Sequence, residues 1–174
     1  MPRPRLPGRR HHPLRRLSDT DRCTIWYLIE VVRASRAPAD RLWELMSDVR
    51  RWPQWLPTVD AVTPLEPARP DEVGARYTVE QPGLPRAVWA ITAIEPGRSF
   101  TWESAQPGIR SVGTHELRPS ADGTTTTVLG IAWSGPLAPL VRVALGRRGR
   151  DYVAREAQAL DETASSPTPG VDGA

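Results

Sequence analysis

Four pairs of turn-forming residues divide the middle of the chain into short segments, and they constrain its fold more than any other feature. These pairs are Pro82-Gly83, Pro96-Gly97, Pro107-Gly108 and Asp122-Gly123. Pro-Gly and Asp-Gly pairs favour tight turns, and segments joined by such turns pair as antiparallel strands, because parallel strands need a long crossover connection. The spacing therefore predicts an antiparallel sheet built from successive hairpins.

The segments between the turns have the composition and alternation of β-strands. The region 124–133 is the clearest, because Thr127, Leu129, Ile131 and Trp133 share one face at a period of two. An earlier segment, 24–34, is rich in β-branched and aromatic residues and reads as one long strand that opens the domain. The other expected strands lie near 58–66, between Gly74 and Pro82, and at 87–95, 100–105 and 110–118.

Three segments instead predict helices. Pro38 precedes ADRLWELMSDV, which has one apolar stripe, and a second short helical turn is expected within 48–56, around Pro53. A long amphipathic helix is expected after Gly135-Pro136. Its expected inward stripe is Leu137, Leu140, Val141, Ala144, Leu145, Tyr152, Val153, Ala157 and Leu160. The order of elements predicts an α+β fold, with a curved antiparallel sheet of six to seven strands wrapped around the long C-terminal helix and two short helices after the first strand.

The charge distribution separates a basic tail from the domain. The chain has 174 residues and a formal net charge of +3, but residues 1–22 contain seven Arg and two Asp, so the remainder has a net charge of −2. A fold that binds nucleic acid should itself be basic, so no nucleic-acid partner is expected for the domain. Residues 1–22 and 164–174 lack apolar periodicity and are predicted to be disordered, leaving one domain at 23–163. An interaction protein that docks through its tail is a third functional class.

Several other classes are excluded by composition. No apolar run approaches the roughly 20 residues of a membrane span, so no stable membrane insertion is expected. Without a secretory signal, the expected location is cytoplasmic. The lone Cys23 and three histidines provide no cluster at metal-ligand spacing, and HELRP at 115–119 departs from a zinc-binding HExxH at Pro119. No metal and no cofactor are therefore expected.

Several local strings resemble a known superfamily over about residues 24–163. They are APADRLWELMSDVRRWPQWLPTV, FTWES, PGIRSVGTHEL, DGTTTTVLGIAWSGPLAPL and the final VAREAQAL. They resemble the START-like SRPBCC superfamily, in its polyketide cyclase/dehydrase and lipid-transport branch. The resemblance implies a helix-grip fold around a largely apolar cavity, with Trp52 and Trp55 at its rim. It transfers no catalytic residues, because the branch has no shared triad.

Tryptophan is the unusual component of this sequence, with seven Trp beside three Tyr and one Phe. Such rings can wall a pocket for a flat hydrophobic ligand, or they can simply fill a core. Strand alternation turns Trp89, Trp102 and Trp133 inward. Gly149 falls on the inward helical stripe, where the missing side chain leaves room for a ligand or permits a close approach of helix and sheet. Both alternatives stay open.

Five polar residues are candidates for the cavity: Tyr77, Glu103, Arg110, His115 and Glu116. Alternation separates His115 from Arg110 and Glu116, and it turns Glu103 to the exposed face beside inward-facing Trp102. His115 is the preferred interior group, because imidazole can exchange a proton near neutral pH. The alternative is a core histidine satisfied by one hydrogen bond.

The sequence therefore predicts a protein that binds a hydrophobic small molecule, such as an aromatic polyketide, a quinone or a lipid. The expected ligand-binding residues are Trp52, Trp55, Tyr77, Trp89, Trp102, His115, Trp133 and Gly149. The alternative is a polyketide cyclase/aromatase or dehydrase, in which His115 or Tyr77 acts as acid or base and Arg110 polarises a carbonyl. The sequence does not define an oligomeric state.

Overall fold

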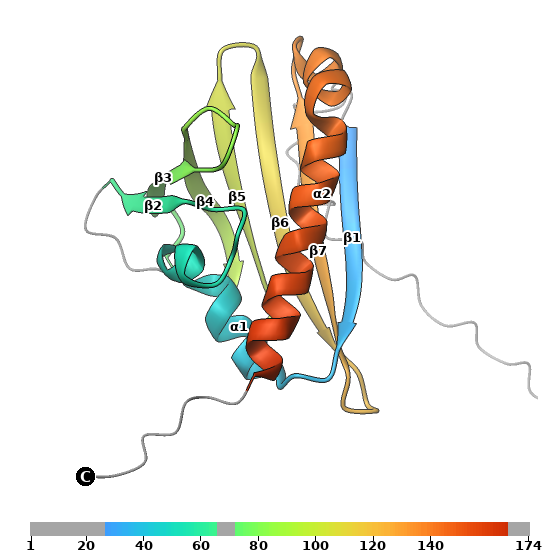
Figure 1. Ribbon diagram of the computed structural model, residues 1–174. Helices are drawn as coiled ribbons and strands as arrows, with labels where there is room; N and C mark the ends of the chain where they lie inside the picture. Colours follow the sequence, from blue (N-terminus) through green and yellow to red (C-terminus); the bar gives the residue numbers. More distant parts are fainter. Residues whose placement is uncertain (1–26, 66–71, 167–174) are drawn as a thin grey trace, which may run out of the picture.

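The computed structural model describes residues 27–65 and 72–166, which form a seven-stranded antiparallel sheet curved around one long helix (Figure 1). The strand order across the sheet is β1-β7-β6-β5-β4-β3-β2. The strands are β1 (Tyr27–Ser35), β2 (Ala61–Pro64), β3 (Arg76–Glu80), β4 (Ala87–Glu95), β5 (Ser99–Gln106), β6 (Ile109–Pro119) and β7 (Thr125–Ser134). The helices are α1 (Ala39–Ser47), the 3-10 helix η3 (Val49–Gln54) and α2 (Ala138–Ser165). The predicted helix-grip architecture is confirmed.

The hairpins form at the predicted turns. The glycine in each of the four turn pairs has a positive φ between 67° and 82°, a conformation that side chains with a Cβ rarely adopt. Strands β3 to β7 therefore lie next to one another in chain order. The last strand, β7, pairs with the first, β1, from Tyr27 opposite Trp133 to Ser35 opposite Thr125. The predicted strand near 58–66 is shorter than expected and covers only Ala61–Pro64.

The two predicted short helices are present between β1 and β2. Helix α1 begins after Pro38 and buries Leu42, Leu45 and Met46. The chain breaks at Asp48 and continues as η3, which buries Trp52. The Trp52 indole N–H donates to the Met46 carbonyl at 3.2 Å, and this bond ties η3 back onto α1.

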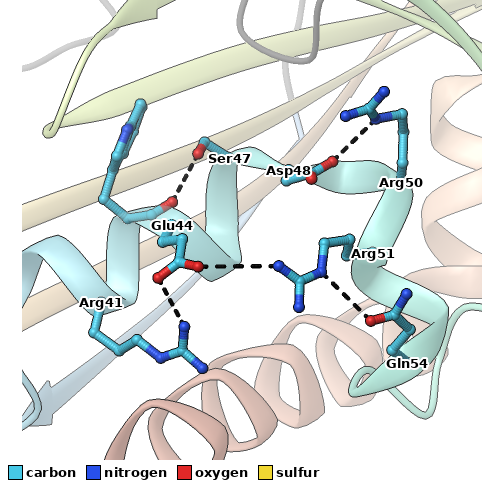
Figure 2. Close-up of polar contacts among 8 residues, drawn as sticks. Arg41, Glu44, Ser47, Asp48, Arg50, Arg51 and Gln54 are labelled. Atoms are coloured by element: carbon cyan, nitrogen blue, oxygen red, sulfur yellow. Dashed lines mark hydrogen bonds and ion pairs between the residues drawn. The ribbon is translucent and has the colours of Figure 1, made fainter. Parts of the chain in front are cut away.

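A surface network also connects these two helices (Figure 2). Glu44 accepts from Arg41 at 2.7 Å and lies 3.9 Å from Arg51, whose Nε donates to Gln54 at 3.4 Å. Exposed ion pairs of this kind contribute about 0–1 kcal/mol each. The position of η3 therefore depends mainly on the burial of Trp52 and its neighbours.

Helix α2 crosses the concave face of the sheet along β1 and β7 (Figure 1). Its inward stripe in the second half is Val153, Ala157, Leu160 and Ala164. Extending this stripe backwards at helical spacing reaches Gly149, Leu145, Val141 and buried Ala138. The expected inward positions of Leu137, Leu140 and Ala144 are wrong, because all three lie beside this stripe and are exposed, Leu137 by 45% and Leu140 by 65%.

The core is divided into two parts along α2. A large cluster joins α1, η3 and the second half of α2 to the sheet, and includes Trp52, Tyr77, Phe100 and Leu160. A small cluster of Ile29, Trp133 and Ala138 lies near the start of α2. Helix α2 ends at Ser165, two residues beyond the expected domain boundary. The rest of the two predicted disordered tails lies outside the described residues.

A partly buried ion pair joins the edge strand β1 to α2. Arg33 Nε donates to Asp161 Oδ2 at 2.8 Å. Burial, the largest single influence, raises the pKa of Asp161, but hydrogen bonds from Ser35, Arg33 and Ser165 and the charge of Arg33 together bring that pKa below its usual value. The folded state therefore favours the ionised form of Asp161 more than the unfolded state does.

We expect Asp161→Asn to destabilise the protein near neutral pH by up to about 1 kcal/mol, because the ion pair is partly exposed. A lowered pKa contributes stability above the unfolded value of about 3.9, and this stability is lost as the pH falls through the folded value. The stabilities of wild type and variant, measured by urea unfolding between pH 7 and pH 2.5, should therefore converge in acid. Asp151→Asn, at an exposed position of the same helix, is the control. A difference that persists below pH 3 contradicts the assignment.

Candidate functional site

A cavity of about 290 Å³ lies between α2 and the inner face of the sheet. It occupies the space between the two core clusters and is partly open to solvent. Strands β4 to β7, the turn between β3 and β4, and one face of α2 provide its walls. Four indole rings dominate the lining, those of Trp52, Trp89, Trp102 and Trp133.

Three of these indoles, those of Trp52, Trp89 and Trp102, form a continuous wall on one side of the cavity. Trp89 and Trp102 lie 4.8 Å apart between ring centroids at an angle of 31°, and Trp52 meets Trp102 edge-on at 5.1 Å. Trp102 reaches this position because its strand neighbour is Gly113, where any Cβ would overlap the Trp102 indole nitrogen. The missing side chain of Gly113 therefore leaves the space that the Trp102 ring occupies.

His115 and Glu156 form a polar pair in the cavity wall. His115 Nε2 donates to Glu156 Oε1 at 2.8 Å. The imidazole is only 4% exposed and stacks on Phe100, with ring centroids 4.1 Å apart and an angle of 6° between the planes. Among the described residues, no group hydrogen-bonds to His115 Nδ1. The ring is therefore fixed in place, with a carboxylate on one side and an unpaired nitrogen on the other.

Glu156 was not among the sequence-based candidates. Its signal in the sequence was its spacing, since it lies seven residues after Gly149 and therefore on the same helical face. A single acidic residue on an otherwise apolar stripe is an irregularity that can be read from sequence. Its pairing with His115 depends on how α2 rotates over β6.

Three expected site residues do not line the cavity. Tyr77 is fully buried in the large core cluster, in a part of the inner face that is already filled. Arg110 lies on the outer face of β6, where it forms a two-pronged ion pair with Glu103 at 2.7–2.9 Å. Trp55 packs edge-on behind Trp52 at 6.3 Å between ring centroids. The expected roles of Tyr77 and Arg110 at a bound ligand therefore lack the required geometry.

Gly149 lines the cavity but also permits a close contact. A Cβ at this position would lie 2.8 Å from Trp133 Cη2 and 3.6 Å from Ile29 Cδ1. Of the two alternatives left open by the sequence, close approach of helix and sheet is the one with direct support. Because Gly149 has no side chain, the backbone of α2 can pack closely against the Trp133 ring.

Two hydrogen bonds join α2 to the turn between β3 and β4 beside the cavity. Arg148 Nη1 donates to the Gly83 carbonyl at 2.6 Å, and the Tyr152 hydroxyl donates to the Pro82 carbonyl. Gln81, Leu84 and Tyr152 from these two segments line the cavity. The Arg148 side chain therefore has a specific partner in this turn.

The described parts of the chain contain no group of three His, Cys, Asp or Glu side chains placed to hold a metal ion. None of the described helices is long and apolar enough to cross a membrane.

The family signature described as "Polyketide cyclase / dehydrase and lipid transport" matches residues 28–164, which include every described strand and nearly all of α2. The chain belongs to this family. Membership of the polyketide cyclase/dehydrase and lipid transport family confirms the resemblance seen in the sequence. No curated protein matches the chain by sequence.

Several solved structures share the fold at low identity. A norcoclaurine synthase from Thalictrum flavum, in complex with dopamine and hydroxybenzaldehyde, aligns at a TM-score of 0.65 with 12% identity, covering 95% of this chain and 100% of that one. The Zhui aromatase/cyclase from Streptomyces sp. R1128 aligns at 0.62 with 17% identity, covering 86% and 100%. At these identities the similarity shows a shared fold.

The contact between Gly149 and Trp133 gives a prediction that compares two glycines of one helix. Gly149→Ala should lower the melting temperature, because the new methyl group overpacks the Trp133 ring and overpacking costs about 1–3 kcal/mol. Gly146→Ala should raise it, because its Cβ meets only Arg142 Cγ at 3.8 Å and alanine gains about 1 kcal/mol of helix propensity. Thermal unfolding followed by circular dichroism measures both. Equal stabilisation by the two substitutions contradicts the close contact.

Proposed function

We propose that this protein binds a flat, largely apolar aromatic molecule between α2 and the sheet. The observation that carries this proposal is the cavity walled by Trp52, Trp89, Trp102 and Trp133. Ligand pockets are mainly apolar, with a few polar groups that fix orientation, and this cavity has that composition. Its remaining polar lining residues are Gln81, Ser104, Gln106, Ser111, His115, Tyr152 and Glu156.

The size of the cavity favours a compact ligand. Its volume of about 290 Å³ lies near the lower end of the range of about 300–1,000 Å³ for small-molecule pockets. Two or three fused rings suit such a space and its indole walls better than a long acyl chain. The relatives support an aromatic ligand, since the norcoclaurine synthase structure contains dopamine and hydroxybenzaldehyde and the Zhui protein is an aromatase/cyclase.

A fluorescent probe tests this proposal. N-phenyl-1-naphthylamine should bind the wild-type protein in a 1:1 complex, with an increase in probe fluorescence. Ser111→Phe should weaken binding at least about tenfold, because Ser111 lies between Ser104 and Trp133 on the inner face and a phenyl ring there occupies the ligand space. Ala105→Phe places the same ring at an exposed position of β5 and should bind as wild type does. Equal binding by both variants contradicts the location.

A second candidate function is acid–base conversion of the bound molecule, and the bond between His115 and Glu156 favours it. A carboxylate that accepts a hydrogen bond from one imidazole nitrogen fixes the orientation of the ring and leaves the lone pair of a general base on the other nitrogen. In this role His115 removes a proton next to a ligand carbonyl, and the resulting enolate attacks a second carbonyl and closes a ring. The imidazolium then returns the proton to the new alkoxide. Loss of water and enolisation of the remaining ring carbonyls give the aromatic product.

The matched test uses a linear poly-β-keto thioester and follows formation of the aromatic product by absorbance. His115→Gln keeps a side-chain donor for Glu156 but removes the proton-exchanging ring. It should lower turnover about 10²- to 10⁴-fold, while N-phenyl-1-naphthylamine binding changes by less than about threefold. Unchanged turnover, or no turnover by wild type, leaves binding as the function of the cavity.

A further inference from the structure

The cavity has an uneven distribution of charge. Among the described residues that line it, Glu156 is the only one with a formal charge apart from the ionisable His115. No arginine of the described residues lines it, although α2 contains several. Arg142 lies over the Tyr27 ring at 5.1 Å and Arg148 binds the Gly83 carbonyl, so neither neutralises the cavity. A negative ligand would therefore meet a carboxylate without a compensating cation from an arginine.

Glu156 keeps hydrogen-bonding capacity beyond its bond to His115. A carboxylate has about four lone-pair positions. Among the described residues, His115 is the hydrogen-bond partner of the Glu156 carboxylate. The side chain is only 16% exposed, so it is largely removed from water. A carboxylate that is buried with few partners is destabilised, and a donor from the ligand would relieve this cost.

The neighbouring polar groups either also prefer a ligand that donates a hydrogen bond or have no preference between donors and acceptors. When the neutral His115 ring donates through Nε2, its Nδ1 has a lone pair and can only accept. The Ser104 and Ser111 hydroxyls and the Gln106 amide all donate and accept, so they do not select a ligand. The amide nitrogen of Gln81 already donates to the Thr58 carbonyl at 3.2 Å. Among the described residues, the polar lining thus contains no arginine that would favour an anionic ligand.

We infer that the cavity selects aromatic molecules that carry a hydrogen-bond donor, a hydroxyl or an ammonium group, with Glu156 as the acceptor, and that it discriminates against aromatic anions. This inference rests on the proposed binding function and adds the ligand's polar group to it. Glu156 is in this view the specificity-determining residue, and His115 is the positioning residue that holds its carboxylate against the cavity wall.

Four naphthalenes of nearly equal shape test the inference on the wild-type protein at pH 7, by isothermal titration calorimetry. They are 2-naphthol, 2-naphthylmethylamine, 2-methoxynaphthalene and 2-naphthoate. A hydrogen bond to a charged acceptor corresponds to about tenfold in affinity or more, so 2-naphthol and the amine should bind at least tenfold more tightly than 2-naphthoate. 2-Naphthol should also bind more tightly than 2-methoxynaphthalene, although the ether is the more apolar molecule.

The variant arm assigns the selectivity to one residue. Glu156→Gln removes the charge but retains an acceptor oxygen, so the advantage of the amine over 2-naphthoate should fall about tenfold or more. Glu162→Gln makes the same change on the same helix at an exposed residue, and it should keep the wild-type ranking. If Glu156→Gln does not fold, the ranking of the four ligands on wild type still decides.

Two outcomes overturn the inference and are distinguishable from failure of the proposed function. If 2-methoxynaphthalene and 2-naphthoate bind as tightly as 2-naphthol and the amine, the cavity binds aromatics without the proposed selection. If the ranking holds but is unchanged in Glu156→Gln, the selecting group is not Glu156. If none of the four ligands and no N-phenyl-1-naphthylamine binds, the proposed function fails and the inference fails with it.

Discussion

A single helix must cover the concave face of a seven-stranded sheet, and this constraint shapes the rest of the molecule. Helix α2 packs along β1 and β7, at one side of the sheet (Figure 1). Near its second half, α1 and η3 help to fill the space beneath it, and the large core cluster forms there. Near its first half, the described residues contain no such layer. A cavity remains there because the described helices do not cover every strand.

The residues around that space are large and rigid, which explains how an open region coexists with a stable fold. Trp102 contacts both Trp52 and Trp89, and the three rings wall the cavity without filling it. Glycine appears where a ring or a helix needs close approach, at Gly113 beneath Trp102 and at Gly149 against Trp133. The apolar wall therefore depends on these two glycines, which leave space for the indole rings, as well as on the rings themselves.

The pair of His115 and Glu156 is the exception to this apolar lining. Placing a carboxylate and an imidazole away from water is unfavourable unless each finds hydrogen-bond partners. A core that only had to be stable would replace both with apolar side chains at little cost. Their presence beside a cavity of about 290 Å³ supports the role toward a ligand that we propose.

The sequence by itself determined the elements and the faces of its strands. The four turn pairs, the alternation in β7 and the inward direction of Trp89, Trp102 and Trp133 follow from local stereochemistry, which repeats at a period of two along any strand. The helical stripe was only partly right, since Leu137 and Leu140 are exposed. The stripe is broad in sequence, and only contact with the sheet selects its centre.

The tertiary structure decided which inward side chains meet. Tyr77 and His115 are both buried, yet only His115 lines the cavity, which strand alternation alone does not decide. His115 and Glu156 lie 41 residues apart in sequence and meet through the rotation of α2 over β6. Helix rotation and sheet curvature arise from the packing of the whole chain. No local period encodes them, so the polar centre of the site appears only in three dimensions.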